Sequence, residues 1–206
     1  MRRTRLTTYC AVALLASQSA LADLQSPEMG GWQIEVIGGT VSPHNPQVTV
    51  RISAYFPNNY WAFGWSWFDV ATNDNESHFQ SIVFPDPLGS RPNCAYLTPG
   101  VPENGAVVGN VVGQVNIGCS ALPMNPIPVW EATWSTTNFD QRSVSVETLN
   151  SVQFRVYANS SATLDTIDLV ELGLFQHGSA VIHVVPAPGA SLCAIGGFVL
   201  VSRRRR

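Results

Sequence analysis

QVTVRISAYFPNNYWAFGWSWFDV, residues 47–70, is the stretch of the sequence that decides the fold. Its first half alternates two sets of side chains, the apolar Val48, Val50, Ile52 and Ala54 and the polar Thr49, Arg51 and Ser53. A period of two turns one set toward a core and the other toward water, as in a β-strand. Pro57, Asn58 and Asn59 then supply the chemistry of a tight turn, and a second apolar run follows them. The stretch therefore predicts a β-hairpin.

The second run carries an aromatic residue at every other position: Trp61, Phe63, Trp65 and Trp67. On a strand these rings share one face, which permits two interpretations. One is a platform on which sugar rings stack, as in carbohydrate-binding modules. The favoured one is the core, because each ring buried there contributes about 1.5 to 3 kcal/mol. Trp130 and Trp134 share a face of another strand and are expected to enter the same core from an opposing sheet.

Residues 23–185 have the same β texture throughout and the length of one domain. Strands are predicted at residues 32–37, 47–56, 60–70, 79–84, 106–117, 129–135, 143–148, 152–158 and 180–185, with a long Pro-rich loop at residues 85–105. The predicted fold class is all-β: a single antiparallel β-sandwich or jelly-roll-like domain. The way the second strand follows the first also loosely resembles cohesin-like and other sandwich modules of bacterial surface proteins.

The N-terminal residues 1–22 have the pattern of a secretory signal peptide. Arg2, Arg3 and Arg5 precede a short apolar run at residues 9–16, and Ala20 and Ala22 occupy the small-residue positions before a cleavage site at Asp23. We therefore expect an N-terminal signal helix, export through the secretion translocon and cleavage by signal peptidase.

The C-terminal residues 186–206 combine Pro186, Ala187 and Pro188, an uncharged apolar stretch at 189–202, and the terminal run Arg203, Arg204, Arg205 and Arg206. This segment resembles the PEP-CTERM sorting signal of exported bacterial proteins, with Ala187 in place of the usual central glutamate. The resemblance implies a hydrophobic helix, transient anchoring in the inner membrane, and processing by an exosortase-like enzyme. The arginines would act as a membrane stop, since each costs about 2.5 to 3.5 kcal/mol to insert. The expected location is the cell envelope, the cell surface or the extracellular matrix.

Two of the four cysteines lie in the terminal segments, which leaves Cys94 and Cys119 in the domain. Both stand in loop-like contexts, and export would bring them to an oxidising compartment. A disulfide between Cys94 and Cys119 is therefore predicted. In the chain-entropy model, such a bridge contributes about 3 kcal/mol.

The charge of the domain excludes one class of function. All 14 carboxylates lie between the two terminal segments, together with only four arginines, which gives a net charge of about −10. Such a domain repels nucleic acid and anionic lipid, so no nucleic-acid partner is expected.

Oxygen ligands are concentrated after the second strand of the predicted hairpin, at Asp69, Asn73, Asp74 and Glu76. Calcium prefers oxygen ligands of this kind. The segment lacks the glycine and the ordered spacing of an EF-hand, so a weak calcium site and a solvated polar turn both stay open.

Acidic residues also occur at Asp165, Asp168 and Glu171, where a carboxylate pair would suggest a glycoside hydrolase. A spacing of three divides them between the two faces of a strand, which favours a solvated helical or turn face. His44, His78, His177 and His183 show no metal-ligand or catalytic spacing. No catalytic residue and no enzymatic activity are predicted.

These observations predict an exported, non-catalytic β-sandwich protein with a structural or adhesive role, sorted by its C-terminal signal. The alternative is a carbohydrate-binding module that uses Trp61, Trp65 and Trp67 to hold an extracellular polysaccharide, with calcium assisting. A glycoside hydrolase is the third reading.

Overall fold

The computed structural model describes residues 28–91, 93–114, 119–159 and 166–186. These residues form strands in two sheets and contain no helix, and hence none that could cross a membrane. The prediction of an all-β sandwich is confirmed for this part of the chain. The predicted cleavage residues Ala20, Ala22 and Asp23 lie outside the described residues, as do Ala187, Pro188 and the run Arg203, Arg204, Arg205 and Arg206. Pro186 is the last residue described.

Sheet A has the strand order β12-β1-β2-β8-β4. Its strands are β1 (Gly30–Ile37), β2 (Gln47–Tyr55), β4 (Ser77–Val83), β8 (Ile127–Thr136) and β12 (Phe175–Gln176). All neighbours are antiparallel except β1 and β12, which run parallel over two residue pairs.

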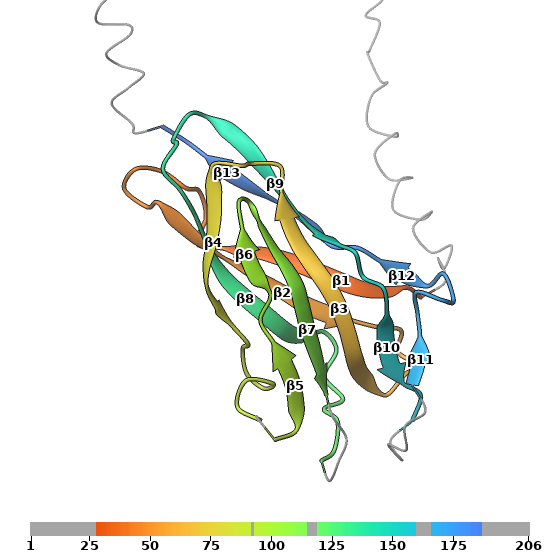
Figure 1. Cartoon of the computed structure of the whole chain (residues 1–206). Helices are drawn as coiled ribbons and strands as arrows, with labels where there is room; N and C mark the ends of the chain where they lie inside the picture. Colours follow the sequence, from red (N-terminus) through yellow and green to blue (C-terminus); the bar gives the residue numbers. More distant parts are fainter. Residues whose placement is uncertain (1–27, 92, 115–118, 160–165, 187–206) are drawn as a thin grey trace, which may run out of the picture.

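Sheet B has the order β11-β10-β3-β7-β5, with β6 beside β7, β9 beside β3 and β13 beside β9. Its strands are β3 (Ala62–Thr72), β5 (Ala95–Thr98), β6 (Val101–Glu103), β7 (Ala106–Gln114), β9 (Arg142–Leu149), β10 (Phe154–Tyr157), β11 (Thr166–Asp168) and β13 (Ser179–Val184). Figure 1 shows β3, β7 and β5 side by side, with the strands of sheet A packed behind them.

The core between the sheets is rich in aromatic rings. Trp32 of sheet A contacts the rings of Phe63, Phe68 and Phe154 of sheet B, with centroids 4.6 to 6.0 Å apart. Trp130 and Trp134 of β8 are fully buried. The prediction that both enter the core from the opposing sheet is confirmed.

Asn110 of β7 is a buried polar residue that joins the two sheets. Its Oδ1 accepts hydrogen bonds from the indole N–H of Trp130 at 2.9 Å and from the N–H of Gly100 at 3.1 Å. Its Nδ2 donates to the carbonyl oxygens of Phe68 and Val107. Because every polar atom of this amide is bonded, it fixes the relative position of the sheets at little desolvation cost.

The predicted hairpin of residues 47–70 is wrong. β2 pairs with β1 and β8 in sheet A, whereas β3 pairs with β10, β9 and β7 in sheet B. Residues 56–61 therefore cross from one sheet to the other, and the N–H of Trp61 bonds to the carbonyl oxygen of Tyr157 on β10. Both edges of β2 are already occupied, so β3 completes its backbone hydrogen bonds in the opposite sheet.

All nine predicted strands overlap observed ones, and four short strands were not predicted: β5, β6, β11 and β12. The first two lie within the segment predicted as a long loop. Both pair with β7, which satisfies the backbone groups of a Pro-rich segment that shows no apolar alternation.

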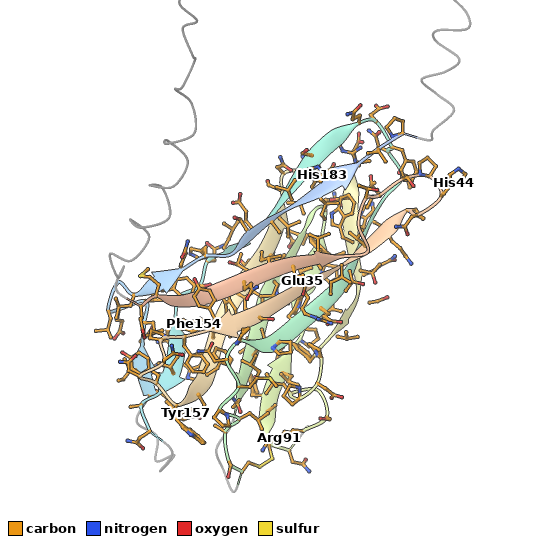
Figure 2. The ribbon with its side chains drawn as sticks, turned by 180° about the vertical axis from the view of Figure 1, so that it is seen from behind. Glu35, His44, Arg91, Phe154, Tyr157 and His183 are labelled. Carbon is orange, nitrogen blue, oxygen red and sulfur yellow. A yellow bond between two sulfur atoms is a disulfide. The ribbon has the colours of Figure 1, made fainter. Side chains whose placement is uncertain are left out.

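The two ends of the described chain lie at opposite ends of the sandwich. β1 begins beside β12, where Gly30 pairs with Phe175, and β13 ends where Val184 bridges to Val41 in parallel. Figure 2 shows His44 and His183 at this second end and Phe154 and Tyr157 toward the first.

Candidate functional site

A β-bulge at Gly64 divides the aromatic row of β3 between the two faces of sheet B. Trp65 pairs with Arg155 and Phe63 with Val156, so Gly64 has no partner residue on β10. One extra residue reverses the inward and outward alternation. Phe63 is buried, Trp65 lies partly exposed on the outer face, and Trp67 has 51% of its surface exposed.

The interpretation that places the whole aromatic row in the core is therefore wrong for Trp65 and Trp67. Ser66 and Phe68 point inward in their place. Trp61 is separate from both, since it packs with Ala62, Ala121 and Tyr157 in a small cluster of its own.

The outer face of sheet B carries a third aromatic residue close to the two tryptophans. Gly113 of β7 pairs with Trp65 on one side and with Tyr96 of β5 on the other, and residues paired in this way lie on the same face of the sheet. In the next row, Val111 stands between Trp67 and Thr98. Tyr96 is 58% exposed.

We call this surface the aromatic face and define it by Trp65, Trp67, Tyr96, Val111 and Gly113. The glycine is required there, because a Cβ at this position would lie 2.5 Å from the Cβ of Trp65. Three aliphatic side chains, those of Val101, Val108 and Leu149, are exposed on neighbouring strands.

Arg155 of β10 closes the aromatic face beside Trp65. Its guanidinium carbon lies 5.6 Å from the centroid of the Trp65 ring, within the range of a cation–π interaction. The carboxylate of Asp168 neutralises the guanidinium at 3.8 Å, and Nη1 donates to the hydroxyl of Thr166. The arginine is thus held in place from both sides.

Asp168 is not on a solvated turn, as the sequence suggested, but is 6% exposed. Its Oδ1 accepts from the N–H groups of Phe154 and Val170, so the carboxylate is a structural acceptor at the end of β11. Glu171 is exposed in the following turn, and Asp165 lies outside the described residues. The described part of the acidic triplet is thus divided between a buried position and a solvated one.

The predicted disulfide joins Cys94 to Cys119, with the Cα atoms 5.7 Å apart. It stands directly before β5, the edge strand that carries Tyr96. The guanidinium of Arg91 donates to the carbonyl oxygen of Ser120 at 2.8 Å and links the same two segments. The bridge therefore holds the outermost strand of the aromatic face against the loop that follows β7.

The four residues considered for calcium have protein partners. Asp69 accepts from the N–H of Gly109 and from the amide of Asn150, and Asn73 accepts from the N–H of Ser145. Asp74 forms an ion pair with Arg142 at 2.7 Å, and Glu76 accepts from Asn138. Across the described ranges, no group of three or more His, Cys, Asp or Glu side chains is arranged to hold a metal ion. Calcium binding here stays a prediction.

One hydroxyl–imidazole pair was not foreseen from the sequence. Ser143 Oγ lies 3.3 Å from His183 Nδ1 across strands β9 and β13, and both residues are exposed. Among the described residues no carboxylate bonds to this imidazole, which a Ser-His-Asp arrangement requires. The prediction that the chain is not an enzyme stays a prediction.

Comparison with known proteins identifies only the fold. No protein-family model matches the sequence, and no curated protein matches it. Solved structures do match: the cohesin module of a family 33 glycoside hydrolase from Clostridium perfringens has a TM-score of 0.52 at 9% identity, over 78% of this chain and 99% of that one. The seventh ScaB type I cohesin from Pseudobacteroides cellulosolvens has a TM-score of 0.55 at 11% identity, over 78% and 95%. The chain is thus similar to cohesin modules in its β-sandwich fold.

Proposed function

We propose that this chain is an exported, non-catalytic binding module with a structural or adhesive role at the cell surface or in the extracellular matrix, and that the aromatic face holds its partner. The observation that carries the proposal is the exposure of Trp67 and Tyr96 on one face of the domain, whereas every other Trp, Tyr and Phe side chain in the described ranges is buried or partly buried.

Exposed aromatic side chains on a rigid sheet are a feature of binding surfaces. Trp, Tyr and Arg are the residue types that contribute most to recognition, and Arg155, Trp67 and Tyr96 stand on β10, β3 and β5, three of four consecutive strands of sheet B. The disulfide holds the strand that carries Tyr96, and Asp168 and Thr166 hold Arg155, which lowers the entropy lost on binding. A cohesin-like sandwich fold is compatible with such a role.

The terminal segments supply the destination in this proposal. The signal peptide at residues 1–22 directs the chain to the secretion translocon and signal peptidase. The segment at residues 186–206 holds it in the inner membrane until an exosortase-like enzyme releases it to the envelope or matrix. The net charge of about −10 on the intervening domain fits a soluble surface environment.

The binding part of the proposal is tested by Trp67→Ala in the full chain, produced in a bacterium with an exosortase-type system. The matched control is Val83→Ala, because Val83 is 50% exposed on the other sheet. We expect equal export of both variants and loss of matrix association only for Trp67→Ala. Equal matrix association of both variants would exclude the aromatic face as the binding surface.

The sorting part is tested separately by replacing Arg203 to Arg206 with neutral residues. Without the membrane stop, unprocessed protein should appear in the medium, as measured by fractionation and mass spectrometry. Unchanged retention and processing would contradict the anchor role of these arginines.

A further inference from the structure

The distances between the aromatic side chains of the aromatic face suit an extended ligand that contains several rings better than a single small molecule. Strands lie about 4.8 Å apart, so Trp65 and Tyr96, two strands from each other, are separated by about 10 Å. Trp65 and Trp67, two residues apart on β3, are about 7 Å from each other. Gly113 leaves no side chain between the first pair. A linear ligand laid across the strands can therefore contact successive aromatic rings.

The aromatic face offers no unpaired cation to an anionic ligand. Asp168 neutralises Arg155, and the carboxylate of Asp69, which accepts hydrogen bonds only from the neutral groups of Gly109 and Asn150, keeps a negative charge at the border of the face. Glu103 and Glu147 are exposed on the same side of sheet B, in the row that passes through Ala71, four residues along β3 from Trp67. The domain as a whole has a net charge of about −10. An anionic ligand is repelled, and an uncharged one is not.

The same quantities argue against a second copy of the chain as the occupant. Two domains of about −10 repel each other. Trp67 and Tyr96 expose about 200 Å² together, and the neighbouring aliphatic side chains add a similar amount. A stable protein interface buries about 800 Å² on each partner.

We propose that the aromatic face binds an uncharged polysaccharide, a step that rests on the proposed function and names its ligand. The sugar rings stack on Trp67, Tyr96 and the exposed part of Trp65, because aromatic faces pack well on the apolar C–H faces of sugars. The hydroxyl of Thr98 and the guanidinium of Arg155, at two borders of the face, are polar groups for the sugar hydroxyls.

The test is affinity electrophoresis of the purified exported protein in gels that contain hydroxyethylcellulose, glucomannan, xylan or dextran, with alginate as the anionic polymer. We expect retardation by at least one neutral polymer, little change between low and high salt, and none by alginate. Trp67→Ala and Tyr96→Ala should each weaken binding about tenfold or more. The matched control is Tyr55→Ala, since Tyr55 stands on the outer side of sheet A. Circular dichroism confirms that each variant is folded.

Three outcomes would overturn the proposal: no retardation by any neutral polymer, preferential binding of alginate, or a dimer in sedimentation that Trp67→Ala abolishes. Matrix digested with polysaccharide hydrolases separates this inference from the proposed function. If digested matrix still retains the parent chain but not Trp67→Ala, the ligand is not a polysaccharide although the binding face stands. If Trp67→Ala never alters retention by intact matrix, the proposed function itself fails.

Discussion

On the outside of sheet A, Glu35, Arg51 and Glu131 stand opposite one another on β1, β2 and β8, and the arginine forms ion pairs with both carboxylates. The corresponding row on the outside of sheet B is Arg155, Trp65, Gly113 and Tyr96, on β10, β3, β7 and β5. We call the outside of sheet A the polar face and define it by Glu35, Arg51 and Glu131, together with the Gln, Thr and Ser side chains beside them.

The polar face is what the solvated side of an antiparallel sheet ordinarily looks like. Its one arginine is paired with both carboxylates, which leaves the row a net charge of −1 and no unpaired cation. The aromatic face leaves large rings in water, which contributes little to folding. The difference supports the proposal that the outer side of sheet B binds a partner.

The largest effect should separate a core tryptophan from one on the aromatic face. Trp130→Ala removes a fully buried ring and its bond to Asn110, and should lower the free energy of unfolding by about 3 to 5 kcal/mol. Trp67→Ala should change it by about 0.5 kcal/mol or less, because half of that ring is already in water. Urea unfolding of the oxidised protein measures both. Similar losses in the two variants would mean that Trp67 belongs to the core.

Next in size is the disulfide, which ties down β5, the edge strand of the aromatic face. Cys94→Ser opens a loop with a sequence separation of 25 residues and should cost about 3 kcal/mol. Ligand binding should weaken as well, because β5 and Tyr96 are no longer held. Thermal melting with and without reductant checks the first point. If the parent protein melts at the same temperature in both conditions, the bridge does not stabilise the domain.

A smaller effect compares one tyrosine from each sheet. Burial raises the pKa of both Tyr157 and Tyr55, so the folded state retains phenolic protons that the unfolded chain releases near pH 10. The resulting stabilisation is complete below pH 10 and is lost as the pH rises through the folded pKa.

Tyr157→Phe should weaken this alkaline loss of stability and cost about 1 kcal/mol at neutral pH, because the hydroxyl donates to the carbonyl oxygen of Gln114. Tyr55→Phe should cost less at neutral pH, since its partner Gln176 is exposed. Urea unfolding at neutral pH and above pH 10 measures both effects. An unaltered alkaline dependence in Tyr157→Phe would show that this phenol does not contribute to it.

The smallest effect is expected on the polar face. Glu131→Gln leaves Arg51 paired with Glu35, and the side chain of Arg51 is 39% exposed, so the free energy of unfolding should fall by less than about 1 kcal/mol. The difference should shrink in high salt. A loss of several kcal/mol would mean that the ion pairs of the polar face hold the sheet together.

The parts of the fold with an uninterrupted sequence pattern could be predicted from the sequence. Alternation along residues 47–55 placed the buried side of β2 correctly, and the unbroken period of Trp130, Ala132 and Trp134 placed β8 in the core. The disulfide followed from there being only two cysteines in the domain. Each of these inferences depended on a local pattern or on counting cysteines. The order of the strands in the sheets changes neither the pattern nor the count.

The rest depended on long-range pairing. The turn at residues 57–59 has the same chemistry whether it closes a hairpin or connects two sheets, so pattern could not reveal the crossing. The bulge did leave a signal, since an isolated glycine within a strand is typical of one, and Gly64 stands among the aromatic residues. Tyr96 left none, because it lies on a four-residue edge strand and meets Trp65 only across Gly113.

The placement of the two ends has a mechanical consequence. β1 and the segment from β12 to β13 run parallel, and the described chain leaves at Pro186 past the end of β13. If the C-terminal segment tethers the chain as proposed, a pull between this tether and a ligand stacked on Trp67 acts along the strands. The backbone bonds of β13 to β9 then bear the load in shear, all at once, instead of opening one after another like a zipper. In the proposed role, the domain would therefore resist unfolding from its C-terminal strand when its ligand is pulled.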